Sequence, residues 1–191
     1  MGAFTTEAIV LRRADWRDHD RILTLLTPRG RLEVLSRGCR RPKSPLLGCS
    51  EVFTMGNFEL FSSREHCMLQ NCQVTDGFYP LRQDFDRLSC AAYLVNVCEA
   101  AVQEGENAAT PFLLLARALG YLSYHTEYTP RAVLTAFLLH FNIAQGYRPR
   151  LNHCVNCGKE LMQPQRVFFD IEQGGVTCLE CREEPCRGGI L

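Results

Sequence analysis

The sequence predicts an α+β protein made of several parts: a small N-terminal β-barrel, a helical middle and a C-terminal module built around four cysteines. Three observations lead to this prediction. Apolar residues follow a strand-like period before Pro80 and a helical period after it. Two C-x-x-C pairs then follow at a separation typical of zinc sites. We expect the barrel over residues 1–79, the helical domain over 80–150, the zinc module over 151–185 and a tail over 186–191.

Five runs of strand character fill the first part of the chain. Turns rich in Asp, Gly and Pro separate them, which is the pattern of a small barrel or sandwich. Five short strands in a segment of this size are typical of an OB-type barrel, whose strand face and loops commonly bind single-stranded nucleic acid. The expected strands are Glu7–Arg12, Arg21–Thr27, Arg31–Ser36, Glu51–Phe61 and His66–Thr75.

Three helices are expected after the barrel. Asp86, Thr110 and Thr129 are residue types that cap helix N-termini, and a proline directly follows each of the two threonines. The apolar stripes of these helices are best explained by mutual packing in a core. The expected helices are Asp86–Glu104, Phe112–Tyr124 and Ala132–Ala144.

The two C-x-x-C pairs admit three interpretations: structural zinc, a pair of disulfides or a redox dithiol. Seven further cysteines are scattered through the chain, which indicates a reducing compartment and disfavours disulfides. Nothing like a thioredoxin βαβ unit surrounds either pair, which disfavours a redox role. We therefore expect structural Zn²⁺, with a hairpin over residues 166–177 between the pairs and Gly158 in a left-handed conformation. The expected ligands are Cys154, Cys157, Cys178 and Cys181.

Charge is distributed unevenly although the net charge is zero. Residues 1–43 carry ten Lys and Arg against five Asp and Glu, so the rest of the chain carries the compensating negative excess. A basic end on an acidic remainder suggests that the basic end meets a polyanion. The aromatic residues Trp16, Phe53, Phe58 and Phe61 are either barrel core or surfaces for stacking bases.

The loop 37–44 is the densest basic stretch. Guanidinium groups grip two phosphate oxygens at once, and lysine adds a diffuse positive charge. A merely solvated charged loop is the alternative. The candidate DNA-binding residues are Arg37, Arg40, Arg41 and Lys43.

The sequence offers no positive case for an enzyme. It contains no nucleotide-binding glycine loop and no spacing of His, Asp and Ser typical of a triad. An apolar run of about 18 residues, as a membrane helix needs, is also missing. We expect a non-enzymatic protein of a reducing cytoplasm that does not contact a membrane.

Two motifs together resemble the bacterial recombination mediator family RecO: the run Asp20–Thr27, and the loop Ser36–Ser44. The resemblance implies an OB domain, a helical domain and a zinc module. It also implies binding of single- and double-stranded DNA, strand annealing and help in loading the RecA recombinase. RecR and the C-terminal tail of the single-stranded-DNA-binding protein are the implied partners, and the nucleoid is the implied place of action. The four loop cations match the family's DNA-contacting loop.

The sequence departs from the family pattern in two places. Arg17-Asp18 stands where the family has Gly-Glu, and family members continue with further helices after the zinc module. We expect the second departure to weaken the groove for the acidic tail. An RNA-binding or transcription-associated zinc-ribbon protein is the alternative function. A catalytic zinc is a third, but four cysteine ligands would leave it no open position.

Overall fold

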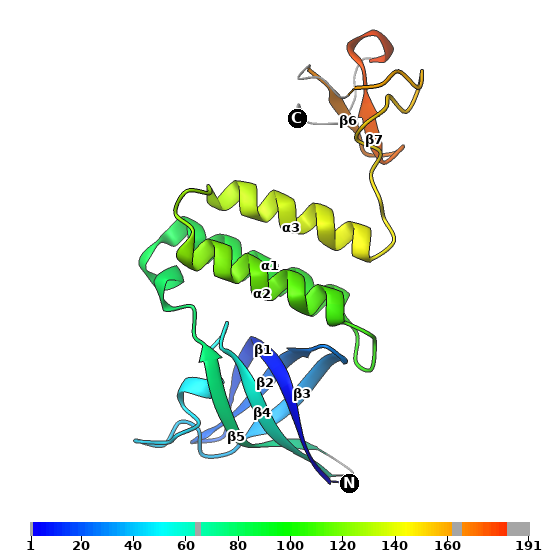
Figure 1. Ribbon diagram of the computed structural model, residues 1–191. Helices are drawn as coiled ribbons and strands as arrows, with labels where there is room; N and C mark the ends of the chain where they lie inside the picture. Colours follow the sequence, from blue (N-terminus) through cyan, green and yellow to red (C-terminus); the bar gives the residue numbers. More distant parts are fainter. Residues whose placement is uncertain (1, 64–65, 162–165, 183–191) are drawn as a thin grey trace. The chain divides into compact units, whose positions relative to one another are not determined.

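The computed structural model describes residues 2–63, 66–161 and 166–182 (Figure 1). The chain divides into two compact units, Met1–Leu138 and Leu139–Leu191. Among the described residues, no helix is long and apolar enough to cross a membrane.

The N-terminal strands close into a barrel in the order β1-β2-β3-β5-β4 (Figure 1). Neighbouring strands are antiparallel except β3 and β5, which pair in parallel through Val34 with Cys67 and Leu35 with Met68. This five-stranded closure is that of an OB fold, so the predicted fold class is confirmed. The strands are β1 Gly2–Trp16, β2 Asp20–Thr27, β3 Gly30–Ser36, β4 Met55–Ser62 and β5 Cys67–Asp76.

Strand β1 is longer than the sequence predicted because it pairs with both β2 and β4 and thereby closes the barrel. Its first half pairs with β4 from Gly2 to Ile9, and its second half pairs with β2 from Ile9 to Trp16. An irregularity between Val10 and Arg12 lies where the strand changes partner. The first half is exposed, so it lacks the apolar alternation that marks a strand in the sequence.

Leucines of β2 and aromatic residues of the following segments fill the barrel core. Leu23, Leu25 and Phe58 are fully buried, and Phe53 is nearly so. Phe53 was predicted to lie in a strand, but it lies in the loop before β4 and has a positive φ of 75°. Both phenylalanines are therefore core residues, which removes them as surfaces for stacking bases.

Three helices follow the barrel: α1 Phe85–Ala101, α2 Ala109–Tyr124 and α3 Pro130–Ala144. Two of the predicted caps are wrong. Asp84, not Asp86, caps α1, since its Oδ1 accepts a hydrogen bond from Arg87 N over 3.0 Å. Thr110 is the second residue of α2, and Asn107 Oδ1 accepts from Ala109 N instead. The cap at Thr129 is confirmed, since its Oγ1 accepts from Ala132 N over 3.3 Å.

The segment after α1 is bonded to the barrel within the first unit. Arg31 N donates to Gln103 O over 3.1 Å, and Ala108 N donates to Pro28 O over 3.0 Å. The first helix therefore ends at Ala101 and not at the predicted Glu104, because the chain beyond it pairs with the β2–β3 turn.

The second unit contains the predicted hairpin, formed by β6 Phe168–Asp170 and β7 Gly175–Thr177. A short 3₁₀ turn, η3 Leu179–Cys181, follows β7. A small core of Cys154, Leu161, Val176 and Cys178 lies beneath it. This core is too small to order the unit by apolar burial alone, so a further constraint is expected.

Candidate metal centre and candidate nucleic-acid interface

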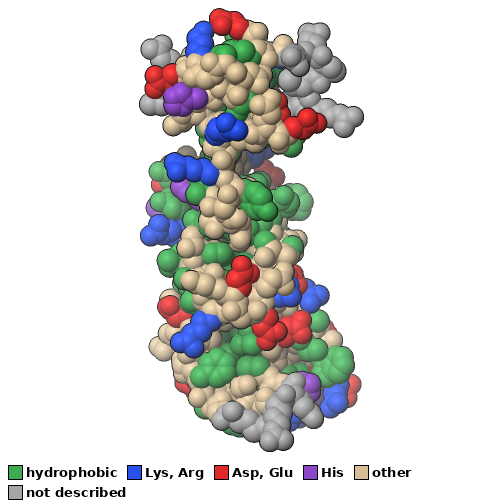
Figure 2. Space-filling model, turned by 90° about the vertical axis from the view of Figure 1, so that its right-hand side faces the viewer, with side chains coloured by type: hydrophobic (Ala, Val, Ile, Leu, Met, Phe, Trp, Pro, Cys, Tyr) green, Lys and Arg blue, Asp and Glu red, His purple; other side chains and the backbone are tan. Residues whose placement is uncertain are grey.

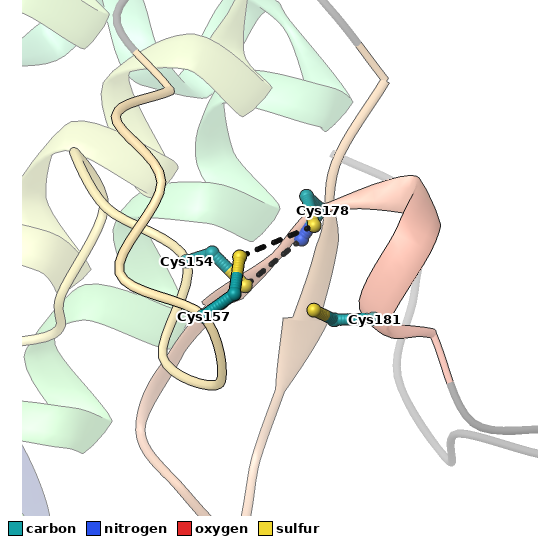
Figure 3. Close-up of side chains that lie close together, drawn as sticks. All are labelled: Cys154, Cys157, Cys178 and Cys181. Carbon is teal, nitrogen blue, oxygen red and sulfur yellow. Dashed lines mark hydrogen bonds between the residues drawn. The ribbon is translucent and has the colours of Figure 1, made fainter.

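The four predicted cysteine ligands come together in the second unit (Figure 3). Their Sγ atoms all lie within 4.8 Å of one another. Cys154 and Cys157 stand on a tight turn, Cys178 follows β7, and Cys181 ends the η3 turn. The sequence therefore placed all members of this cluster correctly.

The first turn has the geometry of a metal-binding knuckle. Gly158 N donates to Cys154 O over 2.9 Å, and Gly158 has the expected positive φ of 75°. Cys178 N donates to Cys154 Sγ over 3.4 Å, which joins the second knuckle to the first (Figure 3). An N–H···S hydrogen bond of this kind stabilises a thiolate, the form in which cysteine binds metal.

The sulfur positions fit a four-coordinate metal ion. Metal–sulfur bonds of about 2.3 Å in a tetrahedron place the sulfurs about 3.8 Å apart. Cys157 Sγ lies 3.8 Å from Cys178 Sγ. Burial raises the pKa of Cys154, but backbone N–H groups of Cys157, Cys178 and Asn156 outweigh it and lower that pKa to about 6. The centre therefore offers four soft sulfur ligands, which leave no position for a substrate.

Cysteines elsewhere in the described chain do not compete with this interpretation. None of the described cysteines forms a disulfide. Burial raises the pKa of Cys98 to about 12, which keeps that thiol protonated and unreactive in the helical core. Cys186 lies outside the described residues.

The basic loop after β3 is bonded to the β1–β2 turn. Gly38 N donates to Asp20 Oδ1 over 2.7 Å, and Arg40 N donates to His19 O over 3.0 Å. These two bonds hold the loop against the neighbouring turn at one end of the barrel. The cations of both segments are thereby gathered in one region.

The four candidate DNA-binding residues are not equivalent. Arg37, Arg41 and Lys43 are exposed, and none of them forms an ion pair with a residue that the structure describes. Arg40 differs, because its Nη1 lies 3.3 Å from Asp15 Oδ2. The structure therefore leaves three of these four side chains available to a ligand and partly engages the fourth.

A groove of about 660 Å³ runs along the barrel beside this loop. It extends over β3 from the β1–β2 turn to the turn between β4 and β5, the region where OB folds bind oligonucleotides. Trp16, Arg17, Arg37 and His66 line it, together with Asp20 and other residues of β2 and β3. Trp16 is 47% exposed, so its ring is open to a stacking partner.

Sequence reasoning did not select Arg17 and His66 as site residues. The signal for Arg17 was present, since the turn 15–18 combines tryptophan, arginine and aspartates. Arg17 has a positive φ of 52°, a backbone conformation that is common in tight hairpin turns. His66 carried no signal, because only the barrel closure brings the β4–β5 turn to the groove.

Much of the remaining positive charge of residues 1–43 is neutralised internally. Arg12 pairs with Glu99 at 2.7 Å, and Arg13 pairs with Glu51. Arg21 is buried and bonds Asp15, Glu51 and Ser50. On the face drawn in Figure 2, Lys and Arg side chains accordingly stand singly instead of forming one continuous patch. The loop after β3, by contrast, keeps three exposed cations, Arg37, Arg41 and Lys43, without an ion pair to a described residue.

A closed five-stranded OB barrel with a groove beside a basic loop, followed by helices and a four-cysteine centre, defines a class of multidomain OB-fold protein. The sequence matches two family models that fall on these parts: recombination protein O N terminal over residues 1–78, and recombination protein O C terminal over residues 82–189. The chain belongs to the RecO family.

Curated relatives agree with the family models. A DNA repair protein RecO of Symbiobacterium thermophilum is 33% identical over 186 residues, which cover 96% of this chain and 73% of that protein. The DNA repair protein RecO of Moorella thermoacetica is 34% identical over 196 residues, covering 99% and 72%. That of Desulforudis audaxviator is 32% identical over 197 residues, covering 100% and 77%. This chain thus corresponds to about three quarters of each relative.

Proposed function

We propose that this chain is a non-enzymatic mediator of DNA repair and homologous recombination in the RecF pathway. It binds single- and double-stranded DNA, anneals complementary strands and assists loading of the RecA recombinase. The observation that carries the proposal is the barrel groove between the β1–β2 and β4–β5 turns, which Arg17 and Arg37 line, together with the basic loop beside it that carries the exposed Arg41 and Lys43. The names of the relatives, each a DNA repair protein, support the same function.

Within this proposal each part of the groove has a role. The guanidinium groups of Arg37 and Arg41 and the ammonium of Lys43 hold phosphates, which fixes the strand without reading its sequence. Trp16 stacks on a base, an interaction that contributes about 1–3 kcal/mol and tolerates any sequence. Binding of this kind suits a protein that must handle many different strands.

The other partners and the metal belong to the same proposal. RecR and the acidic C-terminal tail of the single-stranded-DNA-binding protein are its protein partners, and it works at the nucleoid in the cytoplasm. The four thiolates of the metal centre hold a structural Zn²⁺. The metal orders the second unit and takes no part in chemistry.

Trp16 supplies a direct test because it is the single tryptophan of the chain. Titration with a single-stranded oligonucleotide should quench its fluorescence. Replacing Arg37, Arg41 and Lys43 together by alanine should make the log–log slope of affinity against salt less negative by about 2, at about 0.7 per phosphate contact. A matched control replaces the exposed Arg29, Arg117 and Arg131, which do not line the groove.

Two outcomes would decide against the proposal. An unquenched Trp16, or equal slopes for the loop variant and its control, would remove the groove as a DNA site. RNA displacing DNA at lower concentration, with no annealing of strands coated by the single-stranded-DNA-binding protein, would favour the RNA-binding alternative. Annealing of such coated strands tests strand handling and the tail contact together.

A further inference from the structure

A second groove, of about 430 Å³, lies within the C-terminal unit. One wall is the last part of α3, with Leu139, His140 and Ile143. The other wall is the extended segment 148–153, which leads into the metal centre. None of these residues takes part in the barrel groove, so the two grooves are separate sites.

The charge of this groove has one sign. Arg148, Arg150, His140 and His153 line it and are exposed, whereas no acidic residue is among its lining residues. None of these four side chains forms an ion pair with a residue in the described ranges. The groove thus combines the unpaired guanidinium groups of Arg148 and Arg150 with the apolar side chains of Leu139 and Ile143. This combination favours an anionic ligand that also has apolar surface.

The metal module holds the basic wall in place. Arg150 N donates to Gly174 O over 3.0 Å, and Val176 N donates to Arg150 O over 2.9 Å. The backbone of Arg150 is thereby an extra strand position beside β7. Leu161 N donates to Asn152 O over 2.8 Å, which fixes the same segment two residues later. The wall is therefore held in place by the β6–β7 hairpin and by the segment that follows the first cysteine pair.

Tyr147 distinguishes between possible anionic ligands. It directly precedes Arg148 and is 74% exposed. An exposed aromatic ring beside two guanidinium groups is the combination with which proteins bind single strands, because the ring stacks a base while the cations hold phosphates. The carboxylates of an acidic peptide match the charge, but they offer no flat face that stacks on this ring, whereas every nucleotide carries one.

We propose that this groove, together with Tyr147 next to it in the chain, is a second binding site for single-stranded nucleic acid, with phosphates on Arg148 and Arg150 and a base on Tyr147. The inference rests on the proposed function in that it assigns the same class of ligand, but it uses no residue of the barrel groove. A chain with two such sites can hold two strands at once. That capacity is what annealing of complementary strands requires.

The test compares three variants of the full chain with a fluorescein-labelled oligodeoxythymidine across a salt series. Replacing Arg148 and Arg150 by alanine should make the salt slope less negative by about 1.4, at about 0.7 per contact. Replacing Arg117 and Arg131 removes the same charge from exposed helix positions outside the groove and should leave the slope unchanged. Replacing Tyr147 by leucine should weaken binding with the slope unchanged. Retained zinc content verifies that each variant is folded.

The outcomes separate this inference from the proposed function. Equal slopes for the Arg148/Arg150 variant and its control would overturn the second site while leaving the barrel groove intact. If the variant lacking Arg37, Arg41 and Lys43 kept the same salt slope as its control, while the Arg148/Arg150 variant did not, the barrel site would be overturned instead. An aspartate-rich peptide that binds the wild type but not the Arg148/Arg150 variant, with DNA binding unaltered, would show that the groove takes a peptide and would likewise overturn the inference.

Discussion

The carboxylate of Asp20 accepts a hydrogen bond of 2.7 Å from the backbone N–H of Gly38. This bond joins the start of β2 to the basic loop after β3, two segments that are far apart in the sequence. Gly38 has a positive φ of 64°, a conformation that glycine adopts without steric cost. The two motifs that resemble the RecO family, Asp20–Thr27 and Ser36–Ser44, are thus in direct contact, and Asp20 of the first holds the second in position.

Replacing Asp20 by alanine should release the basic loop. We expect a loss of unfolding free energy of roughly 1.5 kcal/mol, the usual value for a hydrogen bond to a charged group. DNA affinity should fall as well, because the loop cations would lose their fixed spacing. Urea unfolding and oligonucleotide binding measure the two effects. Asp18→Ala, an exposed change in the same turn, should alter neither; equal effects of both variants would contradict this explanation.

The cap of α1 provides a paired test on adjacent acids. Asp84 Oδ1 accepts from Arg87 N, so Asp84→Ala should cost about 1 kcal/mol of stability. Asp86 lies inside the first turn and is exposed, so Asp86→Ala should cost much less. Thermal and urea unfolding of the two variants give the comparison. The reverse order would mean that the cap is at the position the sequence predicted.

Arg87 connects α1 with the end of α2. Its Nη1 donates to Leu122 O over 2.9 Å, and its Nη2 donates to Tyr128 O over 3.1 Å. Arg87→Met keeps much of the side-chain volume but leaves these carbonyls unpaired, so we expect a loss of about 2 kcal/mol. The exposed Arg117→Met on α2 is the control. If both variants unfold at the same urea concentration, the bonds from Arg87 to these two carbonyls do not stabilise the helices.

Metal removal should unfold the second unit and spare the first. Structural zinc commonly contributes on the order of 10 kcal/mol to a module of this size, and here the apolar core is small. Chelation should expose residues 150–182 to a protease while the barrel and α1–α2 resist digestion. Lowering the pH should release the metal as well, since protons compete for the thiolates.

Single substitutions identify the ligands in that experiment. Cys157→Ser should abolish the equimolar zinc of the purified protein, whereas Cys90→Ser, in α1 and outside the cluster, should retain it. Elemental analysis of the proteins measures both. Zinc that persists in Cys157→Ser, or a protein that lacks zinc and resists digestion throughout, would contradict the metal centre.

Local chemistry made much of this architecture predictable. The C-x-x-C pairs and Gly158 specify their own turn, so the metal centre followed from residues that lie close in sequence. The Thr129 cap was predictable for the same reason. The Asp84 cap was missed because two aspartates flank Phe85 and both satisfy the residue preference. Which of the two aspartates becomes the N-cap depends on the residue at which tertiary packing lets the helix start.

The barrel groove proposed to bind nucleic acid could be predicted only in part. Composition singled out the cations of the loop, but it could not separate free side chains from paired ones. Arg40 is engaged by Asp15, and Arg21 is buried among its own acids. Such pairs form between segments that only the barrel closure brings together. The placement of His66 beside Arg37 in the groove has the same origin.

The backbone bonds from Arg31 to Gln103 and from Ala108 to Pro28 also have a consequence for motion. These hydrogen bonds join the barrel to the α1–α2 connection. The two amides therefore exchange with deuterated solvent only when the barrel and this connection separate. Their protection should therefore equal that of the barrel's central strands. The barrel and the α1–α2 connection would then open together as one cooperative unit.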